Sequence, residues 1–456
     1  MQTTRPDSAN ATDGEIRARD RSLAFRAAVA QGLVPREQPV VGLLDVTGII
    51  RSAAALRAAF ATPGVEVTHT FAVKAAALVP VLRLLRDAGI GCEVASPGEL
   101  ALARAAQVPA ALIVLDSPAK TPDELSRALA LGVAVNADNA QELDRLDAAV
   151  AARPTASPLG VRVNPQIGGG SIGAMSTATA TSKFGVPLRD PGAERWLLDA
   201  YAARPWLTRL HCHVGSQGCP LELMAAGVRA VHDLAERVNA AAGRRQVDTL
   251  DIGGGLPVDF GSDEDSPAFA DYADLLRAHV PALFDGRYGI VTEFGRSLLA
   301  KNGSLLARVE YAKSAGGRRI AVTHAGAQVA TRTVFAPDAW PLRVVALDGT
   351  GHPKDGDPVE QDVAGPCCFA GDVVAHARPL PPLDRGDLVA LLDTGAYYFS
   401  THFSYNALPR PGVHGYTVDP DGAVRFATVR APQTPRELTA ECGGGWADSL
   451  SALTGG

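Results

Sequence analysis

A single lysine ends the run VTHTFAVKAA (67–76), which otherwise has the apolar and β-branched composition of a buried strand. A buried ammonium group is unfavourable unless it is paired, loses its proton or is used covalently. The next candidate strand ends with an acid, Glu93, so an ion pair between Lys74 and Glu93 is one interpretation. The other is that Lys74 is a nucleophile that forms a Schiff base.

Three consecutive glycines follow another short apolar run in the sequence DIGGG, which contains Gly253, Gly254 and Gly255. Without Cβ atoms, backbone N–H groups can approach an oxyanion closely, although a glycine triplet alone is more often a tight turn. The sequence EFGR (293–296) then follows the next apolar run. Together the two motifs suggest a binding site for a phosphorylated ligand.

The elements that must position these residues alternate regularly between strands and helices. Setting aside a first apolar run at 40–46, eight candidate strands alternate with amphipathic helical runs; they are 65–73, 89–94, 111–116, 132–138, 159–164, 207–214, 247–253 and 288–294. Eight such units in about 250 residues predict a closed (β/α)8 barrel. A doubly wound open sheet is the competing fold, but DIGGG lacks the G-x-G-x-x-G spacing and occurs at the seventh strand rather than the first.

In a (β/α)8 barrel, the residues that follow the strands meet at one mouth, and the loops after strands 7 and 8 commonly bind phosphate. The residues at these strand ends are Lys74, Glu93, Ser96, Asp116, Asn136, Arg162, Asn164, His213, Ser216, Gly253, Gly254, Gly255, Glu293 and Arg296. A lysine opposite a phosphate site suggests pyridoxal 5'-phosphate, with Glu293 at the pyridine nitrogen and His213 over the ring. We count Glu93 and Arg162 among the predicted cofactor-binding residues.

The pattern changes near residue 297. Strand-like runs separated by Gly, Pro and Asp turns predict a mainly antiparallel β domain over 297–456, including a C-terminal tail. We therefore expect a barrel over 40–296. The N-terminal segment 1–39 is expected to be partly disordered, with its end joining the β domain.

Composition excludes several classes of function. The 456 residues carry a formal charge of -6, and no basic run could follow a nucleic acid backbone, so we predict no nucleic acid partner. The polar N-terminus has no signal-peptide character, and no run of eighteen apolar residues suggests a membrane span. The six cysteines have neither disulfide-scaffold density nor a C-x-x-C metal spacing. These features predict reduced thiols, a cytoplasmic location and no metal.

Several motifs, in order along the chain, resemble those of the fold-type III pyridoxal phosphate-dependent decarboxylases, which act on diaminopimelate, ornithine or arginine. FAVKAA, CEVASPGEL, TSKFG, HCHVGSQ, DIGGGLPV, EFGRSLLAKNG, AGPCCFAGDVVA and DTGAYYFSTHFSYNALPRP resemble the family motifs, and the pattern is most similar to the diaminopimelate branch. The resemblance implies an alanine racemase-like barrel plus β domain. It also implies a carboxy-lyase of amino-acid metabolism.

The resemblance also implies roles for individual residues. Lys74 would form the aldimine, and Cys368 would reprotonate the quinonoid intermediate after CO2 leaves, with Cys367 as the fallback. Ring and phosphate contacts would come from His213, Ser216, Gly253, Gly254, Gly255, Glu293, Gly295, Arg296 and Tyr397. The predicted substrate contacts are Arg332, Phe369, Asp372 and Tyr397. Such enzymes are head-to-tail homodimers whose active sites are shared, which implies the same assembly here.

Departures from the family pattern concern the substrate. The residue after the catalytic cysteine is acidic in the family and receives the distal amine of the substrate, but here it is Phe369. The stretch 324–333 (HAGAQVATRT) keeps only Gly326 and Arg332 of its family motif, and Leu408 replaces an arginine. Phe369 therefore favours a substrate with a neutral, apolar or carboxylate end, such as a non-standard amino acid or an intermediate of a specialised pathway such as a siderophore. Arg332 is interpreted either as an anchor for a substrate carboxylate or as a solvated surface arginine.

Two alternatives to a decarboxylase remain open. A racemase or epimerase of the same fold would need a second base facing Lys74, usually a tyrosine, and would not need the cysteine motif. A non-catalytic pyridoxal phosphate-binding protein would leave the β domain with Cys368 and Tyr397 unexplained.

Overall fold

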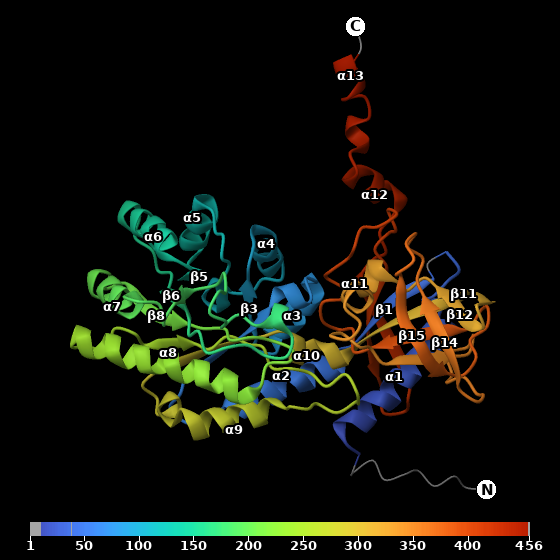
Figure 1. Ribbon diagram of the computed structural model, residues 1–456, viewed down its shortest axis with the longest axis horizontal. Coiled ribbons are helices and arrows are strands. Elements are labelled where there is room, and N and C mark those ends of the chain that lie inside the picture. The colour runs from blue at the N-terminus through green and yellow to red at the C-terminus, as the bar shows by residue number, and fades with distance from the viewer. Residues whose placement is uncertain (1–10, 38, 455–456) are drawn as a thin grey trace. The chain divides into compact units, whose positions relative to one another are not determined.

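The computed structural model describes residues 11–37 and 39–454 and divides into two compact units. One unit comprises residues 47–301, and the other comprises the N-terminal residues to Val46 together with residues 302 onward. Figure 1 shows the first unit as strands surrounded by helices and the second as a sheet-rich body. Each unit is described by itself.

Eight parallel strands form a closed barrel in the first unit. Their order is β5, β4, β3, β2, β10, β9, β8 and β6, and β5 also pairs with β6, which closes the barrel. The barrel strands are β2 (Val67–Ala72), β3 (Gly91–Val94), β4 (Ile113–Leu115), β5 (Ala134–Ala137), β6 (Leu159–Asn164), β8 (Leu207–His211), β9 (Thr249–Asp251) and β10 (Gly289–Phe294). A two-residue strand, β7 (Val186–Pro187), pairs with β6 outside the barrel. The predicted (β/α)8 barrel is confirmed.

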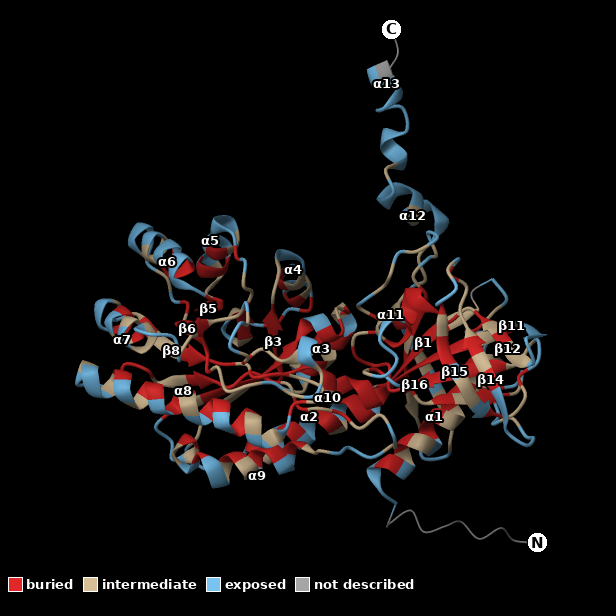
Figure 2. Ribbon diagram, in the orientation of Figure 1, coloured by how far each residue is buried: buried red, intermediate tan, exposed pale blue. Residues whose placement is uncertain are grey.

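Helices cover the outside of the barrel, and all but the last and shortest of them bury one face, as the alternation of buried and exposed residues along them shows (Figure 2). They are α2 (Val46–Phe60), α3 (Val79–Asp87), α4 (Pro97–Ala105), α5 (Pro122–Leu131), α6 (Ala140–Ala152), α7 (Ala193–Ala203), α8 (Leu221–Ala242), α9 (Phe269–His279) and α10 (Arg296–Leu299).

Local sequence explains where these helices begin and end, and α5 is an example. Thr121 and Glu124 form a capping box that satisfies the first backbone N–H groups of α5. Gly132 ends the helix with a φ of +78°, a left-handed conformation that glycine adopts without strain. The chain then turns directly into β5, so that Asn136 reaches the barrel interior at a defined height.

The second unit is a mixed sheet with a helix packed on it. Its strands are β1 (Val40–Asp45), β11 (Gly303–Ala315), β12 (Arg318–Thr323), β13 (Val344–Leu347), β14 (Val359–Ala364), β15 (Val373–Leu380), β16 (Leu388–Leu392), β17 (Gly412–Val418) and β18 (Val424–Arg430). Most neighbours are antiparallel, whereas β1 with β17 and β12 with β14 are parallel. Helices α11 (Ala327–Phe335), α12 (Pro435–Glu441) and α13 (Ser451–Thr454) complete the unit.

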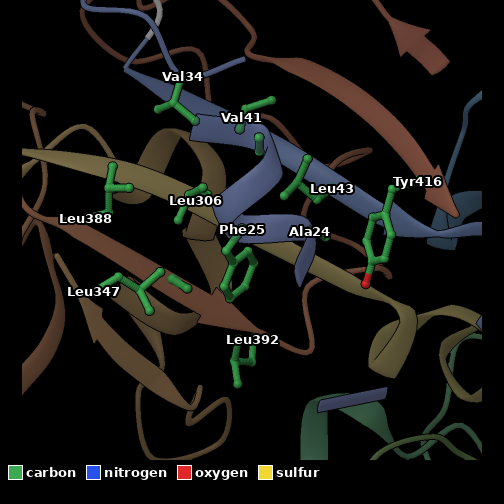
Figure 3. Close-up of a cluster of buried hydrophobic side chains, with 12 residues drawn as sticks. Ala24, Phe25, Val34, Val41, Leu43, Leu306, Leu347, Leu388, Leu392 and Tyr416 are labelled. Atoms are coloured by element: carbon green, nitrogen blue, oxygen red, sulfur yellow. The ribbon is translucent and has the colours of Figure 1, made fainter. Parts of the chain in front are cut away.

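A buried apolar cluster holds the N-terminal helix α1 (Asp13–Ala30) to this sheet (Figure 3). Ala24, Phe25 and Ala28 of α1 pack with Leu43 of β1 and Leu306 of β11. Each fully buried Leu or Phe side chain contributes about 1.5–3 kcal/mol, so this contact is sufficient to fix the helix.

The domain prediction for the N-terminal part of the chain needs two corrections. β1 pairs with β11 and β17 of the second unit, so the barrel does not begin at residue 40. Residues 13–30, expected to belong to a partly disordered segment, form α1, because small and apolar residues recur on the helix face that the sheet covers. The prediction for residues 1–10 lies outside the described residues. Within the described residues, no helix has both the length and the apolar character needed to cross a membrane.

Candidate active site

Lys74 and Glu93 meet at the carboxyl ends of neighbouring strands. Lys74 lies in the short 3-10 turn Val73–Ala75 directly after β2, and Glu93 lies in β3, which pairs with β2. The Lys74 Nζ atom forms a close ion pair with Glu93 Oε2. The Lys74 side chain is 47% exposed whereas that of Glu93 is 2% exposed, so the amine is oriented by a buried acid and remains accessible.

The other predicted residues of the barrel mouth lie in the same unit. Arg162 of β6 is buried, and its guanidinium carbon lies 4.4 Å from the centre of the Phe184 ring of the TSKFG motif. Ser216 is partly exposed, and its backbone N–H donates to the Met175 carbonyl. Arg296 is buried at the start of α10, directly after Gly295.

The glycine triplet packs tightly against strand β10 on one side and against the loop after β8 on the other. A Cβ atom at Gly254 would lie 2.1 Å from the Glu293 carbonyl oxygen, and one at Gly255 would lie 1.8 Å from that of Gly215. The Gly253 N–H donates to Asp251 Oδ1 at 3.1 Å. Glycine is therefore required sterically at these positions, and the phosphate contacts that we expect of the triplet stay a prediction.

His213 follows β8 with its ring held by the triplet. The Gly254 N–H donates to His213 Nδ1 at 3.2 Å, which requires an unprotonated Nδ1. Burial, with the charges of Arg162 and Lys74, lowers the pKa of His213 well below its usual range. His213 is therefore a neutral imidazole with a fixed orientation, which is suited to stacking on an aromatic ring.

A buried cluster of four titratable side chains lies inside the barrel. Asp116 follows β4, His211 and Asp251 end β8 and β9, and Glu293 lies in β10; their side-chain N or O atoms all lie within 4.8 Å of one another. His211 Nδ1 is 3.4 Å from Asp116 Oδ1, and His211 Nε2 is 3.5 Å from Glu293 Oε2.

The carboxyl groups of this cluster differ in acidity. Burial and the neighbouring Asp116 charge raise the pKa of Glu293 well above its usual range. Burial and Glu293 do the same to the pKa of Asp251. Burial also opposes ionisation of Asp116, but the adjacent His211 outweighs it, and the pKa of Asp116 is lowered. The three acids therefore do not ionise together.

In the second unit, the two adjacent cysteines differ in exposure. The Cys367 side chain is buried, its Sγ lies 3.6 Å from Gln328 Oε1, and burial together with Asp372 raises its pKa to about 11. Cys368 is exposed, and Asn406 Oδ1 accepts its backbone N–H at 2.7 Å. Of these two neighbouring cysteines, only Cys368 is exposed at the surface of the unit.

Asp372, a predicted substrate contact, binds backbone N–H groups within its own unit. Asp372 is buried, and its two carboxylate oxygens accept the backbone N–H groups of Ala327 and Cys367, each at 2.6 Å. A Cβ atom at Gly326 or at Gly365 would lie within 2.4 Å of an Asp372 oxygen. Asp372 instead joins the turn before α11 to the cysteine turn.

Arg332 of α11 is not a solvated surface arginine. Its guanidinium carbon lies 4.2 Å from the centre of the Tyr397 ring and 4.9 Å from that of Trp340. Its Nη1 atom is buried and has no hydrogen-bond partner among the described residues. Tyr397 has a φ of +71°, which a non-glycine residue rarely adopts. A cation between two rings, with an unused N–H group, is suited to binding an anion.

Phe369 belongs to a cluster of four aromatic rings beside Cys368. It stacks on Phe335 with ring centres 5.6 Å apart and an interplanar angle of 6°, and it meets the Tyr405 ring edge-on at 5.3 Å. Phe403 contacts both Phe335 and Tyr405. The Tyr405 hydroxyl also donates to the Cys368 carbonyl at 3.4 Å, so the cluster is joined to the cysteine turn.

Comparison with known proteins identifies the family. Residues 46–300 match the model described as "Pyridoxal-dependent decarboxylase, pyridoxal binding domain". The diaminopimelate decarboxylase of Pseudomonas aeruginosa is 34% identical over 75% of this chain and 79% of its own length. That of Actinosynnema pretiosum is also 34% identical, over 81% of this chain and 82% of its own. The chain belongs to the pyridoxal-dependent decarboxylase family.

The fold agrees with this assignment. A crystal structure of the Helicobacter pylori diaminopimelate decarboxylase superposes with a TM-score of 0.79 at 24% identity and covers 91% of this chain and 100% of that one. The protein is therefore a carboxy-lyase of the pyridoxal-dependent decarboxylase family, and its cofactor is pyridoxal 5'-phosphate.

The barrel residues fit this cofactor. Lys74 supplies an accessible amine, and Glu293 Oε1 is a buried oxygen without a hydrogen-bond partner among the described residues. A carboxyl oxygen of this kind matches a pyridine nitrogen, which needs a single hydrogen-bond partner. The cofactor ring also needs a flat surface on which to stack, and the neutral His213 ring, with its fixed orientation, provides one.

His211 and Asp251 are not among the candidate residues predicted from the sequence, although the sequence contains a signal for each. His211 precedes His213 by two positions, so its side chain points to the same face of the strand, and Asp251 is the last strand residue before the glycine triplet.

Proposed function

We propose that this decarboxylase acts on an amino acid whose distal end carries no ammonium group and ends in a carboxylate or an apolar group, rather than on meso-diaminopimelate. The observation that carries the proposal is the packing of Phe369, which follows Cys368. Its ring is stacked on Phe335 and edge-on to Tyr405, so the position offers a hydrocarbon surface.

A charged substrate group would be poorly matched to this surface. Leaving one charge of a buried pair without its partner costs about 3–5 kcal/mol, which corresponds to a factor of about 2 × 10² to 5 × 10³ in kcat/KM. A distal methyl or methylene group has no such cost, and its burial against aromatic rings is favourable.

Arg332 supports a carboxylate at the distal end. Its guanidinium group is held between Tyr397 and Trp340, and its buried Nη1 has no hydrogen-bond partner among the described residues. An arginine with its side chain fixed in this way loses little conformational freedom when it binds a carboxylate.

Cys368 is the proposed proton donor. Its thiol is exposed whereas that of Cys367 is buried, and Asn406 and Tyr405 hold the backbone of the turn on both sides of its Cα. We propose that the enzyme is a head-to-tail homodimer in which the cysteine turn of one chain, with Tyr397, completes the barrel site of the other. The S–H proton of Cys368 is then added to the substrate carbon from which CO2 has left.

In the barrel, Lys74 is the proposed covalent anchor and Glu93 orients its amine. Pyridoxal phosphate, when bound, accepts the electron pair left by the departing CO2. Glu293 would face the ring nitrogen and His213 the ring plane. Ser216, the glycine triplet and Gly295 with Arg296 would hold the phosphate.

A substrate panel tests this function. Purified protein with pyridoxal phosphate is assayed for CO2 release from both enantiomers of lysine, ornithine, glutamate, 2-aminopimelate and norleucine, and from diaminopimelate. We expect the highest kcat/KM for a substrate without a distal amine. A preference for diaminopimelate would refute the substrate proposal and leave the enzyme class intact. Exchange of the Cα hydrogen without CO2 release would indicate a racemase, and no turnover of any substrate would favour a non-catalytic protein.

A further inference from the structure

The buried cluster of Asp116, His211, Asp251 and Glu293 contains more acids than bases. Three carboxyl groups surround one imidazole, and the exposed fraction of each of these residues is 6% or less. Like charges at such distances in a dry interior cannot all persist, so at least one carboxyl group must carry a proton.

The distances assign the single cation of the cluster. His211 lies between two acids, with Nδ1 facing Asp116 and Nε2 facing Glu293. Asp116 receives further support from the Asn136 amide, whose Nδ2 donates to Asp116 Oδ2 at 3.2 Å. Asp116 is thus the better stabilised anion, and the acidities described above agree with an Asp116 carboxylate and with protonated Asp251 and Glu293.

The surrounding charges leave this assignment intact. Glu93 and Lys74 neutralise one another in an ion pair, and His213 is neutral. Lys120, Arg162 and Arg209 are further cations near the cluster. Lys120, which is paired with Glu142, also favours the Asp116 anion, Arg162 acts on His213, and Arg209 acts on Asp251.

We propose that His211 is a positioning residue that pairs with Asp116 and supports Glu293, so that Glu293 meets the bound cofactor as an acid and gives its proton to the ring nitrogen. The Glu293 O–H bond breaks and an N–H bond forms with the lone pair of the ring nitrogen, which leaves a Glu293 carboxylate beside the His211 cation. The proposal rests on the placement of Glu293 in the proposed function above.

The cofactor-free protein provides the first test, because infrared spectroscopy in deuterated buffer detects the C=O stretch of protonated carboxyl groups. At neutral pH we expect this band in the wild type. The part of the band that comes from the cluster should fall by about half in Glu293→Gln, because one of its two protonated carboxyl groups is removed. His211→Gln should increase the band, because Asp116 loses its cation and takes up a proton. Asp116→Asn should decrease it, because His211 then pairs with an ionised Glu293.

The cofactor-bound protein provides the second test, with pyridoxal phosphate labelled with 15N in its ring. We expect the 15N chemical shift of a protonated nitrogen in the wild type and a shift towards the unprotonated value in His211→Gln. His69→Gln is the matched control, because His69 is a buried barrel histidine that contacts the neutral Thr292 hydroxyl at 2.8 Å; it should change neither signal.

Three results would overturn the proposal: no protonated-carboxyl band in the wild type, the same response in His69→Gln as in His211→Gln, or a stoichiometric divalent cation in the purified protein that requires all three carboxylates. Asp116→Asn decides the infrared test if His211→Gln does not fold. Failure to bind pyridoxal phosphate would refute the proposed function instead, and the infrared result would still report on the cluster.

Discussion

Replacing Phe369 by glutamate should restore recognition of a distal ammonium group. The comparison uses two substrates that differ only in the distal amine, diaminopimelate and 2-aminopimelate. A charge-assisted hydrogen bond contributes about 1.5–3 kcal/mol, which corresponds to a factor of about 10 to 150. The ratio of kcat/KM for diaminopimelate to that for 2-aminopimelate should rise by this factor in Phe369→Glu.

The structure also gives the accompanying loss of stability. Phe369 makes one stacked and one edge-on ring contact, each contributing about 0.5–1.5 kcal/mol beyond its buried area. Phe369→Glu and Phe369→Ala should therefore both lower the free energy of unfolding by at least about 1–3 kcal/mol, but only the glutamate variant should change the substrate ratio. An equal change in the ratio for both variants, or no change in either, would refute the reasoning.

Three further predictions concern other parts of the chain. Cys368→Ala should lower kcat by about 10² to 10⁴, the usual contribution of a general acid, while Cys367→Ala should retain most of the rate of product formation. Asp372→Ala should lower the free energy of unfolding by about 3–6 kcal/mol in denaturant titrations, because two backbone N–H groups lose a charged acceptor; unchanged stability would contradict its assigned role. Burial, assisted by Arg57, lowers the pKa of His69 to about 4, so the unfolded chain binds an extra proton between about pH 6.5 and 4. His69 should therefore contribute about 3 kcal/mol of stability above pH 6.5 that is lost as the pH falls to 4, and His69→Gln should remove this part of the pH dependence.

The barrel could be predicted from the sequence because each strand is short, apolar and bounded by a helix start such as the Thr121 capping box or a helix end such as Gly132. The assignment of β1 to the second unit could not be predicted from the sequence. Its residues are apolar on both faces, as in a barrel strand, and only its pairing with β11 and β17 assigns it to the other unit. The same long-range packing decides that residues 13–30 form a helix, since Phe25 and its neighbours need the sheet to cover them.

In the candidate site, residues that end strands were predictable, because parallel strands place their carboxyl ends together. Lys74 and Glu93 are an example, and their ion pair is one of the two interpretations that the sequence allows. The backbone contacts of Asp372 could not be predicted, because a motif position does not reveal whether a carboxylate faces a ligand or backbone N–H groups. The contact of Arg332 with Tyr397 joins segments far apart in sequence, and no spacing rule predicts it.

The central claim is that this decarboxylase does not require, and does not favour, a distal amine on its substrate. The most direct measurement is CO2 release by the wild-type protein, loaded with pyridoxal phosphate, from 2-aminopimelate and from meso-diaminopimelate under identical conditions. We predict a higher kcat/KM for 2-aminopimelate. A higher value for meso-diaminopimelate would contradict the account.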